Sequence, residues 1–374
     1  MIRALLVDDE EPARVRLRSL LADFEDVRVV GEAGDGDEAL RKIAETAPDL
    51  VFLDIQMPGR SGMEVAASLD PPRPRIVFCT AFDQYAIDAF EQHALDYLLK
   101  PLSRDRLARA IQGVRDSAGE RERLQREVAD ASATQARLFP RGPHVVAGLD
   151  YSGVCRAARG VGGDYYDFLS LGERRLGIAL GDVSGKGLFA GLLMAGLQAR
   201  LQSIAPLYGA DLETMMGELN RAMHSCTETN RYATLFFAVY DDAARSLTYV
   251  NAGHSPPLLI RPAPPPGGGL RCRRLETGGT VIGLLADAQY RRETLPLAPG
   301  DILLACTDGV TEASNAAAEE FGEARLEAAI LRHPDGSAAD LRDRVVDEVD
   351  RFRGAAPQQD DITVVVARVP RVGT

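Results

Sequence analysis

The sequence lacks several features that would assign the protein to a class at once. Its five cysteines are scattered without a CxxC pair, and its formal net charge of −12 leaves no basic surplus. Scattered cysteines favour a reducing cytoplasm over a disulfide framework. An acidic chain without a clustered basic surface argues against a nucleic-acid-binding protein.

Long uninterrupted apolar segments are also missing. The N-terminal apolar residues meet acid at Asp8 and Asp9, which is too early for a signal peptide. Residues 188–201 form the most apolar long stretch, but charged neighbours and internal glycines make it too short and interrupted to cross a bilayer. We therefore expect a cytoplasmic protein without a membrane segment, and its 374 residues allow two domains with their own cores.

Residues 1–117 alternate between short apolar segments and helical patterns. Such alternation predicts a doubly wound parallel sheet with right-handed crossovers and a site at the carboxyl ends of its strands. We expect five strands at residues 4–7, 27–30, 50–55, 75–79 and 97–99, and helices at residues 11–21, 37–46, 62–69, 85–92 and 104–111.

The polar residues at these strand ends are Asp8, Asp9, Asp54, Thr80 and Lys100. Three carboxylates that converge on one point repel each other. The expected compensation is a bound Mg²⁺ together with the ammonium group of Lys100.

This arrangement resembles the receiver domain of two-component response regulators, which has a flavodoxin-like fold. The resemblance implies that Asp54 accepts a phosphoryl group from a sensor histidine kinase and that Asp8, Asp9 and Asp54 hold one Mg²⁺. The remaining alternative is a flavodoxin-like domain with acidic loops that is not phosphorylated.

The resemblance also implies a switch made of Thr80, Tyr97 and Lys100. Thr80 and Lys100 would contact the phosphoryl oxygens, Tyr97 would be the switch aromatic, and the bond from Lys100 to Pro101 would be a cis peptide. The runs TAFDQYA at residues 80–86 and DYLLKP at residues 96–101 look most like receivers fused to LytTR-type DNA-binding domains.

Residues 118–141 are expected to form a helical linker. Apolar residues recur at coiled-coil spacing through residues 107–118 and again through residues 124–138, with Gln135 on the second stripe, but the two sets are out of register. One interpretation is a weak homodimeric coiled coil that transmits a signal between the domains. The other is a spacer helix that lies on its own C-terminal domain.

Residues 142–370 contain strands that directly follow one another, as in antiparallel sheets. A hairpin is expected at residues 232–240 and 246–251, with helices at 188–204, 212–226, 324–332 and 338–352. Acidic residues recur at strand ends, and all-oxygen clusters of this kind select Mg²⁺ or Mn²⁺. These acids are Asp164, Asp182, Asp308, Asp360 and Asp361.

The motifs around these acids resemble the PPM/PP2C-like serine/threonine phosphatases of the SpoIIE/RsbU group. They read VGGDYYD at 161–167, GDVSGKG at 181–187, NAGHSPP at 251–257, TDGVTE at 307–312 and DDIT at 360–363. The resemblance spans nearly the whole segment and implies an α-β-β-α sandwich of antiparallel sheets. The chain as a whole is then an α/β protein: a receiver domain, a helical linker and a phosphatase domain.

The resemblance implies two Mn²⁺ or Mg²⁺ ions that activate a water for in-line attack on phosphorus, so that no side-chain nucleophile is needed. Asp182 would be the catalytic residue that bridges both ions, assisted by the carbonyl of Val183. Asp164 would serve one ion, and Asp308 and Asp360 the other. The sequence leaves open whether Asp361 exchanges roles with Asp360.

Other residues of the motifs have simpler interpretations. Asp167 is expected to be a capping or surface acid, and Asn251 and His254 to be hydrogen-bonders that structure a loop. Lys186 and Arg159 could contact a substrate phosphate, but solvated cations are the simpler expectation. Ser184 stands where eukaryotic relatives have a histidine, so no general acid is identified.

We expect a response regulator whose phosphorylation at Asp54 controls a phosphatase acting on a phosphorylated STAS-domain protein. The competing hypothesis is a non-catalytic adaptor that docks a partner, but the metal carboxylates are all present. A DNA-binding transcription factor is disfavoured by the acidic chain, which has no recognisable recognition helix.

Overall fold

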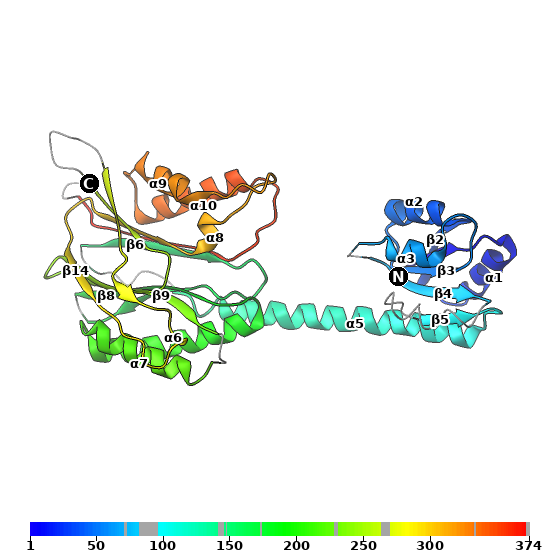
Figure 1. Cartoon of the computed structure of the whole chain (residues 1–374), viewed down its shortest axis with the longest axis horizontal. Helices are drawn as coiled ribbons and strands as arrows, with labels where there is room; N and C mark the ends of the chain where they lie inside the picture. The colour runs from blue at the N-terminus through cyan, green and yellow to red at the C-terminus, as the bar shows by residue number, and fades with distance from the viewer. Residues whose placement is uncertain are drawn as a thin grey trace. The chain divides into compact units, whose positions relative to one another are not determined.

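The computed structural model describes residues 1–70, 73–81, 96–140, 146, 148–172, 174–227, 231–262, 270–332 and 334–371. The helix expected at residues 85–92 lies outside these ranges. Internal contacts divide the chain into two units, Met1–Arg126 and Glu127–Thr374. The division falls inside the helix α5 (Arg104–Gln135), and each unit is described by itself (Figure 1).

The first unit contains a five-stranded sheet in which every strand pair is parallel (Figure 1). This confirms the predicted sheet. The strand order is β2-β1-β3-β4-β5, which is that of a doubly wound fold. The strands are β1 (Ile2–Val7), β2 (Val27–Ala33), β3 (Leu50–Leu53), β4 (Arg75–Thr80) and β5 (Asp96–Leu99).

Helices cover both faces of this sheet. The helix α1 (Glu11–Leu21) and the first turns of α5 share one core with Leu6, whereas α2 (Gly36–Thr46) and α3 (Gly62–Ala67) share the other with Leu5. Successive residues of β1 thus face opposite cores, as the two-residue period of a strand requires.

The second unit contains two sheets. Both sheets are antiparallel, apart from a two-residue parallel pairing of β13 with β10 in the first sheet. The first sheet has the order β13-β10-β9-β8-β7, with β14 also on β10; its strands are β7 (Tyr165–Ser170), β8 (Arg175–Val183), β9 (Ala233–Asp241), β10 (Ser246–Ala252), β13 (Gly278–Gly279) and β14 (Glu293–Pro296). The second has the order β12-β11-β15-β16-β6; its strands are β6 (Asp150–Arg156), β11 (Leu258–Pro262), β12 (Leu270–Arg274), β15 (Ile302–Cys306) and β16 (Ile362–Arg368).

Three hydrophobic layers hold these sheets and their helices together. Residues such as Phe236 and Val365 fill the space between the sheets, and helices pack on both outer faces. The helices on the first sheet are α6 (Leu188–Tyr208) and α7 (Leu212–His224), and those on the second are α8 (Asp308–Thr311), α9 (Gly322–Leu331) and α10 (Ala338–Arg353). This confirms the predicted α-β-β-α sandwich.

Among the described residues, α6 is the one helix long and apolar enough to pass a length-and-composition test for crossing a membrane. In the fold, however, Met194, Leu197 and Leu201 are fully buried against the first sheet. The apolar composition of α6 is therefore explained by its packing as a core helix of the second unit.

The layer between the two sheets should dominate the stability of the second unit. Phe236 is fully buried there, with its ring centroid 5.7 Å from that of Tyr249. Because Phe236→Ala removes a large buried ring and leaves a cavity, we expect a loss of about 3–5 kcal/mol in the free energy of unfolding, measured by denaturant titration with circular dichroism. Leu207→Ala, at a residue of α6 that is 79% exposed, should change it by less than about 0.5 kcal/mol. Equal effects of the two changes would contradict the packing described.

Candidate functional site

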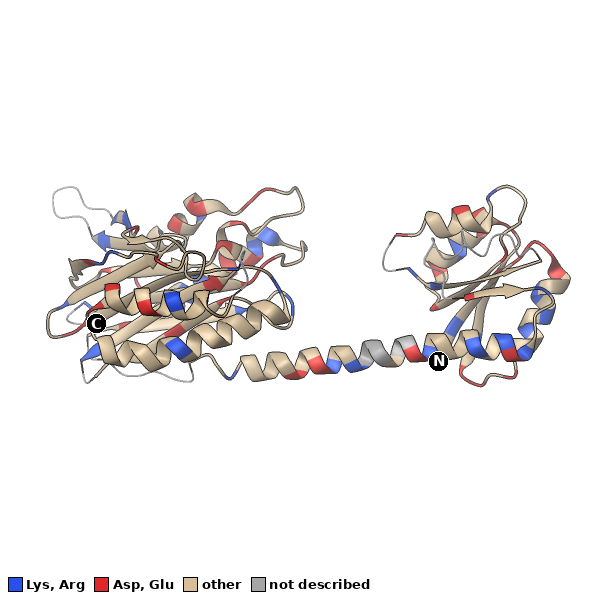
Figure 2. Cartoon of the chain, turned by 60° about the horizontal axis from the view of Figure 1, so that its bottom comes forward, with Lys and Arg blue, Asp and Glu red and all other residues tan. Residues whose placement is uncertain are grey.

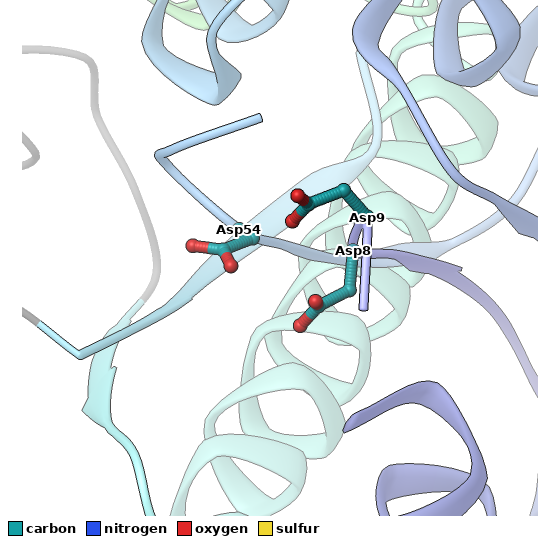
Figure 3. A group of neighbouring side chains, drawn as sticks. All are labelled: Asp8, Asp9 and Asp54. Atoms are coloured by element: carbon teal, nitrogen blue, oxygen red, sulfur yellow. The ribbon is translucent and has the colours of Figure 1, made fainter. Parts of the chain in front are cut away.

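Three carboxylates meet at the carboxyl edge of the parallel sheet in the first unit. The register of β1 and β3 places Val7 beside Leu53, so the next residues, Asp8 and Asp54, also lie side by side. One oxygen from each of Asp8, Asp9 and Asp54 lies within 4.8 Å of the others (Figure 3). Asp8 and Asp54 are buried and Asp9 is exposed, so the cluster opens to solvent on one side.

Lys100 supplies the positive charge at this cluster. Its Nζ lies 2.7 Å from an oxygen of Asp8 and 2.7 Å from an oxygen of Asp54. Burial raises the pKa of Asp54, whereas the hydrogen bond from Lys100 opposes this rise. The remaining carboxylate oxygens form a hard donor set of the kind that Mg²⁺ prefers.

The predicted switch residues surround the same edge. Thr80 is fully buried at the end of β4, and its Oγ1 finds no hydrogen-bond partner among the described residues. A buried hydroxyl without a partner is uncommon and is available to an additional ligand group. Tyr97 pairs with Phe78 across β4 and β5 and packs at the rim of the core beneath α2 and α3. The peptide bond from Lys100 to Pro101 is cis, as expected.

In the second unit, each sheet brings two acids to one edge. The register of β7 and β8 pairs Tyr165 with Gly181, so Asp164 and Asp182 flank this pair at the same end of the sheet. On the second sheet, Asp308 follows β15 and Asp360 precedes the antiparallel neighbour β16. The sandwich therefore explains why four acids that are far apart in the sequence gather at one place.

The acids of the two sheets influence each other's ionisation. Burial, followed by the charges of Asp308 and Asp360, raises the pKa of Asp182. Burial and Asp360 likewise raise the pKa of Asp308. Mutual repulsion among carboxylates is relieved by a bound cation, and the all-oxygen donor set fits Mg²⁺ or Mn²⁺. These acids are more widely spaced than those of the first unit, which form the one group of three within 4.8 Å in the described part of the chain.

Asp164 is held differently from the other three acids. It is 2% exposed, and its Oδ2 accepts hydrogen bonds from Thr307 Oγ1 at 2.7 Å and Thr363 Oγ1 at 2.5 Å. Burial, and then the charge of Asp182, raises its pKa well above the usual range. Asp164 thus ties the first sheet to the second at the edge where the acids meet.

Asp360 and Asp361 have different partners. Asp360 Oδ2 lies 2.7 Å from Lys186 Nζ, and Asp360 contributes to the raised pKa values of Asp182 and Asp308. Asp361 also raises the pKa of Asp182, but its carboxylate accepts hydrogen bonds at 2.8 Å from the backbone N–H groups of Ala158 and Gly163. Asp361 therefore anchors the loop that carries Asp164. The sequence alone could not tell which of the two adjacent acids has this role.

Several neighbouring residues also have defined partners. Ser184 Oγ accepts a hydrogen bond from the Tyr232 N–H at 3.0 Å. The Val183 carbonyl lies close to Gly163, where an added Cβ would meet it at 2.8 Å. Lys186, expected as a solvated loop cation, is indeed exposed, and it also forms an ion pair with Asp360.

The structure corrects one minor expectation and confirms another. Asp167 is buried rather than at the surface, because Tyr165 and Gln202 donate hydrogen bonds to its carboxylate at 2.9 and 2.8 Å. Asn251 is indeed a loop organiser. Its side chain accepts from the backbone N–H of His254 at 2.8 Å and donates to the carbonyls of His254 and Leu275.

Sequence reasoning missed the contacts that hold Asp164. Thr307 directly precedes Asp308, and Thr363 lies two residues after Asp361. Hydroxyl residues this close to acids at strand ends are the signal from which these hydrogen bonds could have been predicted. Gln135 contacts the loop before Asp164 through Gly162, but 27 residues separate the two, so no local pattern indicates this contact.

Comparisons with known proteins agree with the folds of the two units. A family model described as Stage II sporulation protein E (SpoIIE) matches residues 172–370, and one described as response regulator receiver domain matches residues 4–112. The SiaA-PP2C domain of Pseudomonas aeruginosa superposes with a TM-score of 0.58 at 21% identity, covering 67% of this chain and 99% of that chain. The PP2C phosphatase domain of SpoIIE from Bacillus subtilis, with a fragment of its regulatory domain, gives 0.51 at 23% identity, covering 59% and 63%. At these identities the superpositions show a shared fold.

The first unit has a relative with higher sequence identity. The transcriptional regulatory protein BtsR of Salmonella typhi is 49% identical over 123 residues, which cover 33% of this chain and 52% of that protein. The chain thus spans about half the length of the curated relatives it matches. The similarity covers a third of this chain, and the receiver-domain model matches residues 4–112.

A buried histidine beside the acidic edge should make stability depend on pH. Burial lowers the pKa of His254 from 6.5 to about 4. Between these values the unfolded chain binds more protons than the folded one, so the stabilisation is complete above pH 6.5 and is lost as the pH falls towards 4. The stability difference between wild type and His254→Gln should shrink by about 2 kcal/mol from pH 7 to pH 5, measured by urea unfolding. A difference that stays constant with pH would contradict a neutral, buried His254.

Proposed function

The chain belongs to the SpoIIE family, and from that premise we propose that it is a response regulator whose phosphorylation at Asp54 controls a metal-dependent protein serine/threonine phosphatase. The observation that carries this proposal is the meeting of acids from both sheets at one edge, where burial and mutual repulsion raise the pKa of Asp182. Raised pKa values of clustered carboxylates are typical of functional sites.

The residues at this edge have the chemistry needed for two divalent ions. Asp182, with the carbonyl of Val183, would face both ions, Asp308 and Asp360 would hold one, and Asp164 the other. When bound, Mn²⁺ or Mg²⁺ would supply Lewis-acid chemistry that activates a water and neutralises the phosphate. The carboxylates position these groups on two rigid sheets, which is what pre-organised catalysis requires.

Two polar side chains near the acids have roles that follow from their contacts. Ser184 accepts a hydrogen bond from the Tyr232 N–H, so its hydroxyl is a loop contact and we assign it no catalytic part. Lys186 lies beside Asp360, where its charge would attract a substrate phosphate as well as the carboxylate. The phosphoserine or phosphothreonine substrate would therefore approach over the 184–187 turn.

The receiver would act as the input. A sensor histidine kinase would phosphorylate Asp54, with one Mg²⁺ held by Asp8, Asp9 and Asp54. Lys100 and Thr80 would bind the added oxygens, which is supported by the contact of Lys100 with Asp54 and by the lack of a partner for the Thr80 hydroxyl among the described residues. Tyr97, at the rim of the same core, would report the change to the rest of the domain.

The proposed substrate is a phosphorylated STAS-type protein of a partner-switching system, in the cytoplasm. A homodimer through α5 fits the exposed side chains of Leu124 and Val128, which are 59% and 42% exposed. A non-catalytic adaptor is the alternative, and hydrolysis of a phosphoserine substrate distinguishes the two.

Asp182→Asn tests the catalytic assignment. With Mn²⁺, wild-type protein should hydrolyse p-nitrophenyl phosphate and a phosphoserine STAS protein, and the release of phosphate measures the rate. The rate of the variant should fall below about one hundredth of the wild-type rate. This loss is larger than the roughly 10–100-fold loss typical of changes to residues that only support metal ligands. Asp167→Asn, which alters a buried acid of the neighbouring strand, should retain activity within severalfold. Substantial turnover by Asp182→Asn would refute the mechanism, and an inactive wild type would favour the adaptor.

Asp54→Ala tests the control by the receiver. Beryllofluoride, which mimics a phosphoryl group on aspartate, should change the phosphatase rate of the wild type severalfold and leave Asp54→Ala unchanged. Asp37→Ala is a matched control, since this receiver acid has a side chain that is 72% exposed, pairs with Arg60 and is not a member of the three-carboxylate cluster. A wild-type rate that ignores beryllofluoride would remove the regulatory part of the proposal.

A further inference from the structure

The last residue of α5 is joined to the loop that precedes Asp164. Gln135 Nε2 donates a hydrogen bond to the Gly162 carbonyl at 2.7 Å, and the Gly162 N–H donates one to Gln135 Oε1 at 3.0 Å. The side-chain amide thus pairs with both backbone groups of one residue. Gln135 is 8% exposed at the end of a helix whose preceding turns are largely exposed. Both hydrogen bonds are buried, which makes each costly to break.

The loop itself has little freedom to move alone. A Cβ at Gly162 would lie 2.2 Å from Asp361 Oδ2, and one at Gly191 of α6 would lie 2.3 Å from Val161 Cγ1. The Gly163 N–H also donates to Asp361 at 2.8 Å. The loop is therefore held by the strand edge at Asp361, by α6 and by Gln135. A displacement of Gln135 must either break its two hydrogen bonds or move the loop.

Next to these hydrogen bonds there is space. A pocket of about 340 Å³ is bordered on one side by Ser132 and Gln135 of α5 and the following Ala136, and on the other by Cys155, Gly162 and Asp164. The pocket is partly open to solvent, so this space allows the end of α5 to shift towards it without a collision. Asp164 borders the same pocket, so a shift has a direct route to its side chain.

The other end of the same helix belongs to the core of the receiver. Leu107 and Ile111 are fully buried beneath its sheet, and Arg115 forms an ion pair with Asp26. Charged residues of both signs lie along α5 (Figure 2). Backbone hydrogen bonds make a helix a stiff element, so a displacement or rotation at one end is transmitted to the other.

We propose that Gln135 is a positioning residue that couples the place of Asp164 to the position of α5, so that the state of the receiver reaches the metal site through its paired hydrogen bonds to Gly162. This inference rests on the proposed function and adds to it the residue through which control acts. Gln135 touches neither the substrate nor the proposed ions. Its effect passes through Gly162 to Asp164, two residues further on.

Gln135→Leu is the test variant, because leucine has a similar size and offers neither the donor nor the acceptor. In the full-length protein we expect it to weaken Mn²⁺ binding roughly tenfold, measured by electron paramagnetic resonance of free Mn²⁺, which corresponds to about 1.4 kcal/mol. It should also abolish the change in phosphatase rate on adding beryllofluoride. Thr134→Ala, at an exposed residue of the same turn, should leave both quantities as in the wild type.

A purely structural role for Gln135 makes a different prediction. It would lower the thermal midpoint but leave the Mn²⁺ affinity and the ratio of rates with and without beryllofluoride at wild-type values. That outcome in folded Gln135→Leu protein would overturn the inference. A wild type that does not hydrolyse the substrate or does not respond to beryllofluoride would instead be a failure of the proposed function.

Hydrogen exchange on the wild-type protein tests the same inference without any substitution. Because Gln135 Oε1 holds the Gly162 N–H, exchange in a peptide covering residues 158–163 should change severalfold when beryllofluoride is added. Asp54→Ala is the control and should show no change. If Gln135→Leu does not fold, this measurement decides the question. Unchanged exchange in a wild type whose phosphatase rate responds to beryllofluoride would overturn the inference.

Discussion

Repulsion between carboxylates is the constraint on which the second unit depends. Acids that sit on different sheets are held close enough for Asp308 and Asp360 to raise the pKa of Asp182. Without a cation such an arrangement costs free energy, so it persists because the surrounding fold imposes it. The three hydrophobic layers of the sandwich supply that stability, and the hydroxyls of Thr307 and Thr363 hold Asp164 across the two sheets.

The first unit meets the same constraint with a different solution. There, Lys100 lies between Asp8 and Asp54 and balances part of their charge within the chain. At the acidic edge of the second unit, Lys186 is half-exposed, and its ion pair is with Asp360. A site balanced by its own ammonium group suits a reversible modification, whereas a cluster with less internal compensation has a stronger need for divalent ions.

The sequence predicted the acids and the sheets because both are local features. An acid near the end of a strand, such as Asp182 or Asp308, is visible as an apolar run that leads to an acid next to a glycine. What depends on distant partners was not predictable. Asp361 anchors a loop because the N–H groups of Ala158 and Gly163 point at it. Asp167 is buried because α6 brings Gln202 to it. Neither contact leaves a local pattern in the chain.

The long helix shows how two such sites can be connected through one element of the chain. Its first turns are part of one core, and its last residue is hydrogen-bonded to a loop of the other. A coupling free energy of about 1–3 kcal/mol is enough for a 5–150-fold allosteric effect. Losing one buried hydrogen bond costs about 1–3 kcal/mol, so the two between Gln135 and Gly162 are of the right size. Regulation then requires a small movement of one stiff element and no rearrangement of either sheet. The pocket beside Gln135 leaves room for that movement, while the packed layers of the sandwich stay as they are.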